Sequence, residues 1–180
     1  DTSYDLYPSL GGNPVESPKL QWRFPSGSKV TFSHLQYEKN LKGWDGSQIP
    51  LIMFDELQHF TERMFFYMLS RNRSMCGVKP YIRATCNPDP DSWLLTFLLA
   101  AGYINIDTGD PIPEMSGVIK YFVRESGAIH WGDTEEELKE KFPNLLPKSF
   151  TFIPATIDDN QILMKENPEY VANLDAMLEY

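Results

Sequence analysis

The sequence lacks the features that define several classes of protein. Two cysteines, Cys76 and Cys86, are too few for a disulfide framework, and we expect ordinary free thiols in a reducing compartment. No apolar run is long enough to span a membrane, and the N-terminus has neither the basic nor the apolar segment of a signal peptide. With 42% hydrophobic and 13% aromatic residues, the 180-residue chain is instead predicted to be a folded domain with a core.

A basic excess is also lacking. The net charge is −9, and residues 1–100 carry ten basic and ten acidic side chains, so the acidic excess lies in residues 101–180. A domain that binds DNA by itself usually has a basic face. We therefore expect any DNA contact to be local or to involve other parts of a larger protein.

The N-terminal part contains a hairpin pattern. Residues 21–24 and 29–34 alternate between apolar and polar side chains on either side of a Pro-Ser-Gly-Ser turn. We expect one face of this hairpin to be buried, comprising Trp22, Phe24, Val30 and Phe32.

Two strand–helix patterns follow. Residues 49–54 form a continuous apolar run, typical of a parallel strand covered on both faces, and a helical spacing of apolar residues begins at Leu57 and ends near Leu69. Residues 81–86 predict a second strand, and Asp91 or Ser92 is expected to cap a helix over residues 93–99. This alternation predicts an α/β layer with a parallel sheet.

Beyond residue 102 the pattern changes. Residues 118–123 and 128–131 predict a hairpin, and residues 133–142 a short helix with Asp133 and Glu136 in capping-box spacing. Residues 150–153 predict another strand, and a last helix is expected to begin at Asn167.

An acidic pair, Asp55 and Glu56, directly follows the first apolar strand. Four apolar residues followed by Asp-Glu is the Walker B pattern, in which the aspartate holds Mg²⁺ through water and the glutamate orients the attacking water. The alternative is a structural helix start, where the helix dipole also favours acids.

The second strand ends in Thr85-Cys86-Asn87, small polar residues suited to sensing a γ-phosphate. The alternative is that Asn87-Pro88-Asp89 is an ordinary turn.

Together these segments resemble phage terminase large subunits. The resemblance covers about residues 20–180 and rests on four internal motifs and on the tail; these are Trp22-Arg23-Phe24-Pro25-Ser26-Gly27-Ser28, Gly43-Trp44-Asp45-Gly46, Phe54-Asp55-Glu56-Leu57, Ala84-Thr85-Cys86-Asn87-Pro88, and the segment from Phe152-Ile153-Pro154-Ala155 to Asn167-Pro168-Glu169-Tyr170. It implies an α/β fold, a partial P-loop NTPase (RecA-like, terminase ATPase) of three layers with a mainly parallel sheet, plus a β-hairpin. Residues 1–155 would be an incomplete ATPase domain, and residues 156–180 a helical lid or linker.

The resemblance also implies roles and partners. Asp55 takes the magnesium role through water, Glu56 the catalytic role, and Thr85, Cys86 and Asn87 the coupling role. The intact protein would use Mg²⁺ and ATP in the host cytoplasm. Its partners would be double-stranded DNA, the portal protein, the terminase small subunit and further copies of itself in a ring, with no membrane.

The sequence departs from the family in one respect that affects activity. It contains no G-x-x-x-x-G-K-[ST] motif, and the family places that loop upstream and a nuclease domain downstream. We therefore expect the isolated chain to bind ATP poorly and to be inactive. Arg71, Arg73 and Arg83 are candidate phosphate or DNA contacts, with solvated surface charges as the alternative, and His59 is expected on a helix surface.

Two other functions remain open from the sequence. One is a metal-dependent nuclease that uses Asp55, Glu56, Asp89 and Asp91, since two-metal sites need converging carboxylates. The other is a non-catalytic interaction module left in a prophage.

Overall fold

The structure is a computed structural model that describes residues 2–18, 20–87, 89–167 and 169–170. It is a mixed α/β protein, and the described residues form three small sheets, of which one is parallel and two are antiparallel. The chain forms two compact units, residues 1–87 and 88–180, and each is described by itself. The predicted division at residue 155 remains a prediction.

The first unit begins with a small aromatic cluster. Helix α1 (Thr2–Leu6) precedes an antiparallel sheet of β1 (Asn13–Val15), β2 (Gln21–Arg23) and β3 (Lys29–Thr31). The Trp22 side chain is completely buried, and the rings of Tyr4 and Tyr7 meet it edge-on at centroid distances of 5.1 and 5.4 Å. The predicted hairpin is confirmed, but the prediction of a buried Phe32 is wrong. Its side chain is 46% exposed because β3 ends at Thr31, before the alternation reaches it.

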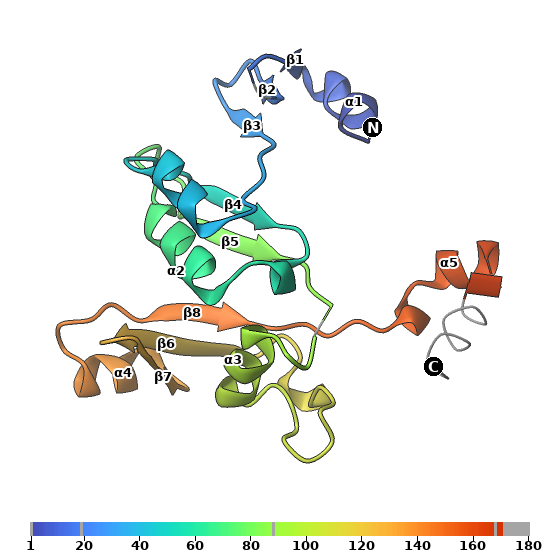
Figure 1. Ribbon diagram of the computed structural model, residues 1–180. Coiled ribbons are helices and arrows are strands. Elements are labelled where there is room, and N and C mark those ends of the chain that lie inside the picture. The colour runs from blue at the N-terminus through green and yellow to red at the C-terminus, as the bar shows by residue number, and fades with distance from the viewer. Residues whose placement is uncertain (1, 19, 88, 168, 171–180) are drawn as a thin grey trace. The chain divides into compact units, whose positions relative to one another are not determined.

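The second half of this unit contains the parallel pair. Strands β4 (Leu51–Phe54) and β5 (Tyr81–Ala84) run side by side in the same direction, with Leu51 opposite Tyr81 and Phe54 opposite Ala84 (Figure 1). At their start, Nδ2 of Asn72 donates hydrogen bonds to the carbonyl oxygens of Ile49, Pro50 and Tyr81 at 2.9–3.1 Å. One side chain therefore ties both strands at the same end.

The prediction that β4 is covered on both faces is wrong. Ile52 and Phe54 are buried, whereas the intervening Leu51 and Met53 are 40% and 70% exposed. The apolar cover lies on one side, where the Phe54 ring meets Phe60 at 5.0 Å and Phe65 of helix α2 (Glu62–Arg71) at 5.9 Å. The run of four apolar residues is therefore split between a buried face and an open face.

The helix predicted from Leu57 is interrupted. Residues Leu57–His59 form a 3-10 turn, and α2 begins only at Glu62 because the Thr61 side chain caps it, accepting a hydrogen bond from the Met64 amide at 3.2 Å. The apolar spacing from Leu57 onward therefore extends across a break between two separate helical segments. A further 3-10 helix, Glu38–Trp44, precedes β4 and buries Leu41.

The second unit is built around an antiparallel sheet in the order β7-β6-β8. The predicted hairpin is confirmed as β6 (Ile119–Glu125) and β7 (Ala128–Gly132), and the last strand is β8 (Lys148–Thr151) rather than residues 150–153. Helix α4 (Glu135–Lys141) is capped by Thr134, whose hydroxyl accepts from the Glu137 amide. The predicted capping box at Asp133 and Glu136 is therefore one residue out of register.

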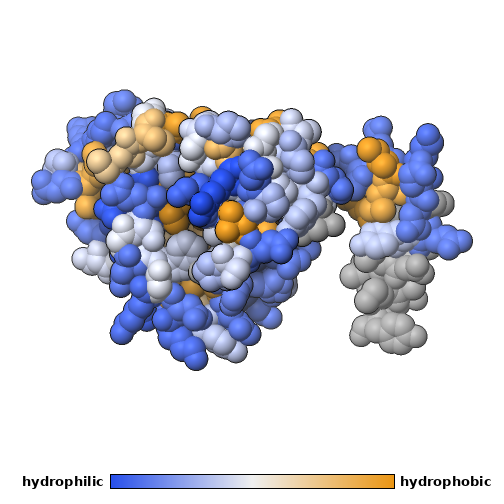
Figure 2. Space-filling model, turned by 90° about the horizontal axis from the view of Figure 1, so that it is seen from above, coloured by the Kyte–Doolittle hydropathy of each residue, from blue (hydrophilic) through white to orange (hydrophobic). Residues whose placement is uncertain are grey.

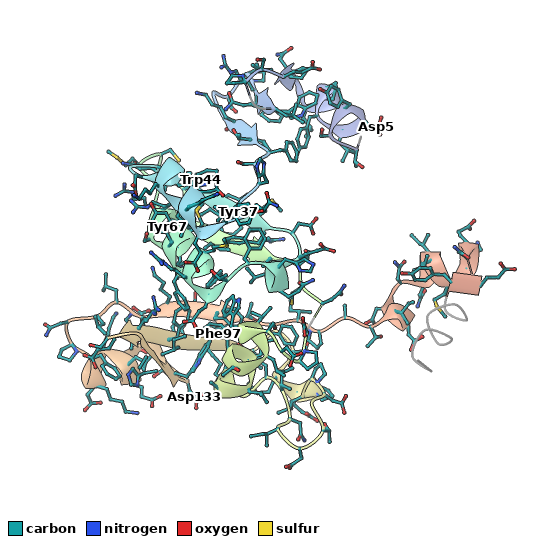
Figure 3. All side chains as sticks on the ribbon, viewed as in Figure 1. Asp5, Tyr37, Trp44, Tyr67, Phe97 and Asp133 are labelled. Atoms are coloured by element: carbon teal, nitrogen blue, oxygen red, sulfur yellow. The ribbon has the colours of Figure 1, made fainter. Side chains whose placement is uncertain are left out.

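Helix α3 (Trp93–Ala101) forms as predicted and follows Ser92 at the N-cap position, but it does not belong to a parallel layer. Phe97 points into the antiparallel sheet (Figure 3), where its ring lies 5.7, 4.8 and 5.1 Å from those of Phe122, Trp131 and Phe150. Hydrophobic periodicity identified this helix but contained no information about which sheet it covers.

The C-terminal segment includes α5 (Gln161–Glu166), whose Ile162 is 77% exposed. The helix predicted from Asn167 falls, apart from residues 167 and 169–170, outside the described residues. Within the described ranges, no helix combines the length and apolar character needed to cross a bilayer. On the face shown in Figure 2, hydrophobic side chains are interspersed with hydrophilic ones.

Candidate functional site

The candidate site lies where the two parallel strands end. Because β4 and β5 are parallel and Phe54 is opposite Ala84, the next residues, Asp55 and Thr85, emerge at the same edge. Open α/β sheets bind ligands at the carboxyl ends of their strands. The structure thus brings together the two segments that the sequence marked as chemically important.

The hydroxyl of Thr85 joins these segments. Its Oγ1 donates to Oδ1 of Asp55 at 2.7 Å and accepts from the Glu56 amide at 3.1 Å. The backbone continues the pairing, since Thr85 N–H donates to the Phe54 carbonyl at 3.0 Å and Leu57 N–H donates to the Thr85 carbonyl at 2.8 Å. We call these four hydrogen bonds the Thr85 clasp.

Glu56 adopts a backbone conformation that is uncommon for a residue with a side chain. Its φ of 54° and ψ of 59° are left-handed, a region that costs free energy for non-glycine residues and is found more often at functional sites. The clasp holds this conformation because it binds the amides of Glu56 and Leu57. The carboxylate remains exposed, with Oε2 3.5 Å from Nε2 of His59. The exposed His59 lies in a 3-10 turn rather than on the surface of the predicted helix.

The residues after Thr85 are also positioned. Cys86 is half-buried, and this burial raises the pKa of its thiol, so it stays protonated near neutral pH. Asn87 is exposed, and its backbone N–H donates to Oε1 of Gln58 at 3.1 Å. Gln58 was missed by the sequence analysis, because the contact depends on the 3-10 turn that the helical periodicity did not reveal.

The acidic side chains at this edge, Asp55 and Glu56, are both exposed. Asp55 is exposed, and Thr85 engages one of its two carboxylate oxygens. Within residues 2–18, 20–87, 89–167 and 169–170, no group of three or more His, Cys, Asp or Glu side chains could hold a metal. Magnesium ions commonly use one or two carboxylates and complete their octahedron with water and phosphate oxygens.

Two of the three candidate arginines, Arg71 and Arg73, contact groups other than the carboxylates of Asp55 and Glu56. Arg71 lies 4.8 Å above the Tyr67 ring, with Nη2 3.7 Å from Oδ1 of Asp45, and Nε of Arg73 donates to the Ser47 carbonyl at 3.4 Å. The Tyr67 hydroxyl donates to the same Asp45 carboxylate, which raises the pKa of Tyr67. Figure 3 shows Tyr67 on α2 and Trp44 in the 3-10 helix Glu38–Trp44. Arg71 and Arg73 thus hold the loop around residues 45–47.

Arg83 has a different setting. It lies on β5 opposite Met53, with its guanidinium 5.8 Å from the centre of the Tyr81 ring. A phosphate or DNA role for the three arginines remains a prediction.

The additional acids proposed for a nuclease have a local role. Oδ1 of Asp89 accepts a hydrogen bond from the Asp91 amide at 2.9 Å in the turn before α3. Such Asx turns are common before helices and need no metal.

Comparison with known proteins shows the family of the chain. No curated protein and no solved structure gives a significant match. The family model described as "Terminase large subunit, T4likevirus-type, N-terminal" matches residues 7–177, nearly the whole chain. The chain therefore belongs to the N-terminal family of T4likevirus-type terminase large subunits, which gives it a role in phage DNA packaging.

Proposed function

We propose that this region supplies the magnesium-binding and catalytic acids of an ATP-hydrolysing DNA-packaging motor. The observation that carries the proposal is the Thr85 clasp, which holds Asp55 and Glu56 beside the end of the neighbouring parallel strand. If Asp55 and Glu56 were present only because a helix dipole favours acids at its start, Asp55 would not need a hydrogen bond from Thr85, 30 residues away. The parallel pair would then be part of a three-layer P-loop NTPase sheet in the intact protein.

Each residue has a distinct task in this proposal. Asp55 would hold Mg²⁺ through water, and the ion would supply positive charge to offset the charge of the ATP phosphates. Glu56, exposed and held by its backbone, orients the attacking water and draws off its proton. Thr85 and Asn87 hydrogen-bond near the γ-phosphate, and the half-buried Cys86 fixes the turn between them.

The motor also implies partners. Membership of the family implies DNA and the packaging complex in general. We further propose double-stranded DNA as the substrate moved, the portal protein and the terminase small subunit as contacts, and a ring of copies of the motor protein. Because the acidic excess lies in residues 101–180, we propose that the DNA contact is local or involves other parts of that assembly.

Glu56→Gln tests the proposal in an intact terminase large subunit that contains this sequence. The glutamine keeps the size of the side chain but cannot accept the proton, so we expect ATP turnover to fall at least about 100-fold while ATP still binds. Gln36→Met, in an exposed residue of the same unit, is the matched control and should turn over normally. Turnover that survives Glu56→Gln would contradict the motor assignment, and metal-dependent cleavage of plasmid DNA by the 180-residue chain would favour the nuclease.

A further inference from the structure

A second link joins the acid-bearing segment to the turn after β5, beyond the Thr85 clasp. Oε1 of Gln58 accepts a hydrogen bond from the backbone N–H of Asn87 at 3.1 Å, across 29 residues of sequence. Gln58 and Asn87 each lie two residues beyond a residue of the clasp, Glu56 and Thr85 respectively. This bond therefore acts on the outer part of the site, where the Asn87 side chain is exposed.

The Gln58 side chain is attached to a firmly held piece of backbone. Leu57, its neighbour, is only 5% exposed, and its amide is bound by the Thr85 carbonyl at 2.8 Å. His59 N–H donates to the Glu56 carbonyl at 3.0 Å, which closes the 3-10 turn around Gln58. Gln58 thus lies between two residues, Leu57 and His59, whose backbone amides are both hydrogen-bonded.

The backbone conformation of Asn87, whose amide is bound by the Gln58 side chain, is also restricted by its neighbour in the sequence. Asn87 precedes Pro88, and a residue before proline is confined largely to extended backbone. A hydrogen bond from its amide to Gln58 therefore further restricts the direction in which the Asn87 side chain leaves the backbone.

We propose that Gln58 is a positioning residue that ties the orientation of Asn87 to that of Glu56. This inference rests on the proposed ATPase function. In that setting, loss of the γ-phosphate at Asn87 is transmitted through the amide and the Gln58 side chain to the backbone that orients Glu56. Gln58 itself touches neither ATP nor the attacking water.

The kinetic test compares two variants of similar size in the intact protein. Gln58→Met removes the strong acceptor, and we expect kcat to fall about fivefold, the equivalent of about one hydrogen bond, with KM changed less than about twofold. Gln58→Glu retains a carbonyl-type oxygen and should restore kcat to within about twofold of the wild type. Gln36→Met, an exposed glutamine of the same unit, controls for the substitution itself.

The structural test uses the 180-residue chain and needs no ATP. Amide exchange measured by NMR should show the Asn87 N–H losing protection in Gln58→Met and keeping it in Gln58→Glu, while the Leu57 N–H, bound to Thr85, stays protected in both. Unchanged Asn87 exchange in Gln58→Met would overturn the inference, as would wild-type kcat in that variant. So would a glutamate variant with a protected Asn87 amide but methionine-like kcat.

Failure of the inference is distinguishable from failure of the function. If Glu56→Gln abolishes turnover and Gln58→Met does not lower it, the motor assignment stands and the positioning role is wrong. If Glu56→Gln has no effect, the assignment on which the inference depends is itself wrong.

Discussion

The acid edge of the β4–β5 pair and the aromatic core of the second unit are stabilised in different ways. At the acid edge, the key contacts are hydrogen bonds of exposed groups, a left-handed glutamate and an apolar strand face that is open on one side. In the second unit, Phe97 is 4% exposed and meets three aromatic rings of one sheet within 6 Å. One region is held by directional bonds and the other by burial.

This difference corresponds to what each region has to do. An exposed hydrogen bond contributes roughly 0.5–1.5 kcal/mol, whereas burial of a large aromatic side chain contributes several times more. A nucleotide site must leave its carboxylates open to water, Mg²⁺ and phosphate, so it cannot be stabilised by covering them. Directional bonds keep Asp55 and Glu56 in place without hiding them.

Phe97→Ala should have the largest effect on stability. Removing the ring leaves a cavity among Phe122, Trp131 and Phe150, and we expect the free energy of unfolding to fall by about 3–5 kcal/mol. Urea unfolding followed by tryptophan fluorescence measures it. Thr96→Ala, exposed on the same helix, is the control and should be nearly neutral. A loss below about 1 kcal/mol would mean that burial does not dominate this unit.

Thr85→Val should have a small effect on stability and a large effect on activity. Valine matches the shape of threonine but can neither donate to Asp55 nor accept from the Glu56 amide, so stability should fall by only about 1 kcal/mol. ATP turnover of the intact protein should fall about tenfold or more, because both acids lose their positioning. Thr85→Ser retains the hydroxyl and should stay near the wild type. Equal turnover in the valine and serine variants would show that the clasp is not needed for activity.

The features of the site that depend on local pattern could be predicted from the sequence. Asp55 follows the apolar run at 49–54 and Thr85 lies near the end of the strand predicted over 81–86, and parallel pairing necessarily places two such ends at one edge. The hairpin of β6 and β7 was equally clear because alternation and a Ser-Gly turn both indicate it. The Walker B and coupling roles of these residues remain predictions, since the geometry supports them without testing catalysis.

The features that depend on packing between elements could not be predicted. A continuous apolar run does not reveal that Leu51 and Met53 lie on an open face, because covering a face depends on which helices are available. The apolar residues of α3, including Phe97, have the same spacing whether the helix covers a parallel or an antiparallel sheet. The link between Gln58 and Asn87 needs a 3-10 turn that follows Glu56 and is separated from α2 by the Thr61 cap, and no periodicity encodes that break.

The smallest expected effect is a pH dependence of stability in the second unit. It tests whether an ion pair contributes to the stability of this unit in addition to its aromatic core. Lys120 donates a hydrogen bond to Asp133, which lowers the pKa of that carboxyl in the folded state. A lowered pKa gives stability that is present above the unfolded value of about 3.9 and is lost as pH falls through the folded value. Because Asp133 is 76% exposed, the pair should contribute at most about 1 kcal/mol.

Asp133→Asn measures this contribution. The variant should be slightly less stable than the wild type in urea unfolding at pH 7, and the difference should vanish as the pH falls through the lowered pKa of Asp133 in the folded state, where both states bind the proton. Asp107→Asn, an exposed acid of the same unit, should show no such difference. A gap between wild type and Asp133→Asn that persists at low pH would mean that the asparagine disturbs packing, and the stability of this unit would then be due to burial alone.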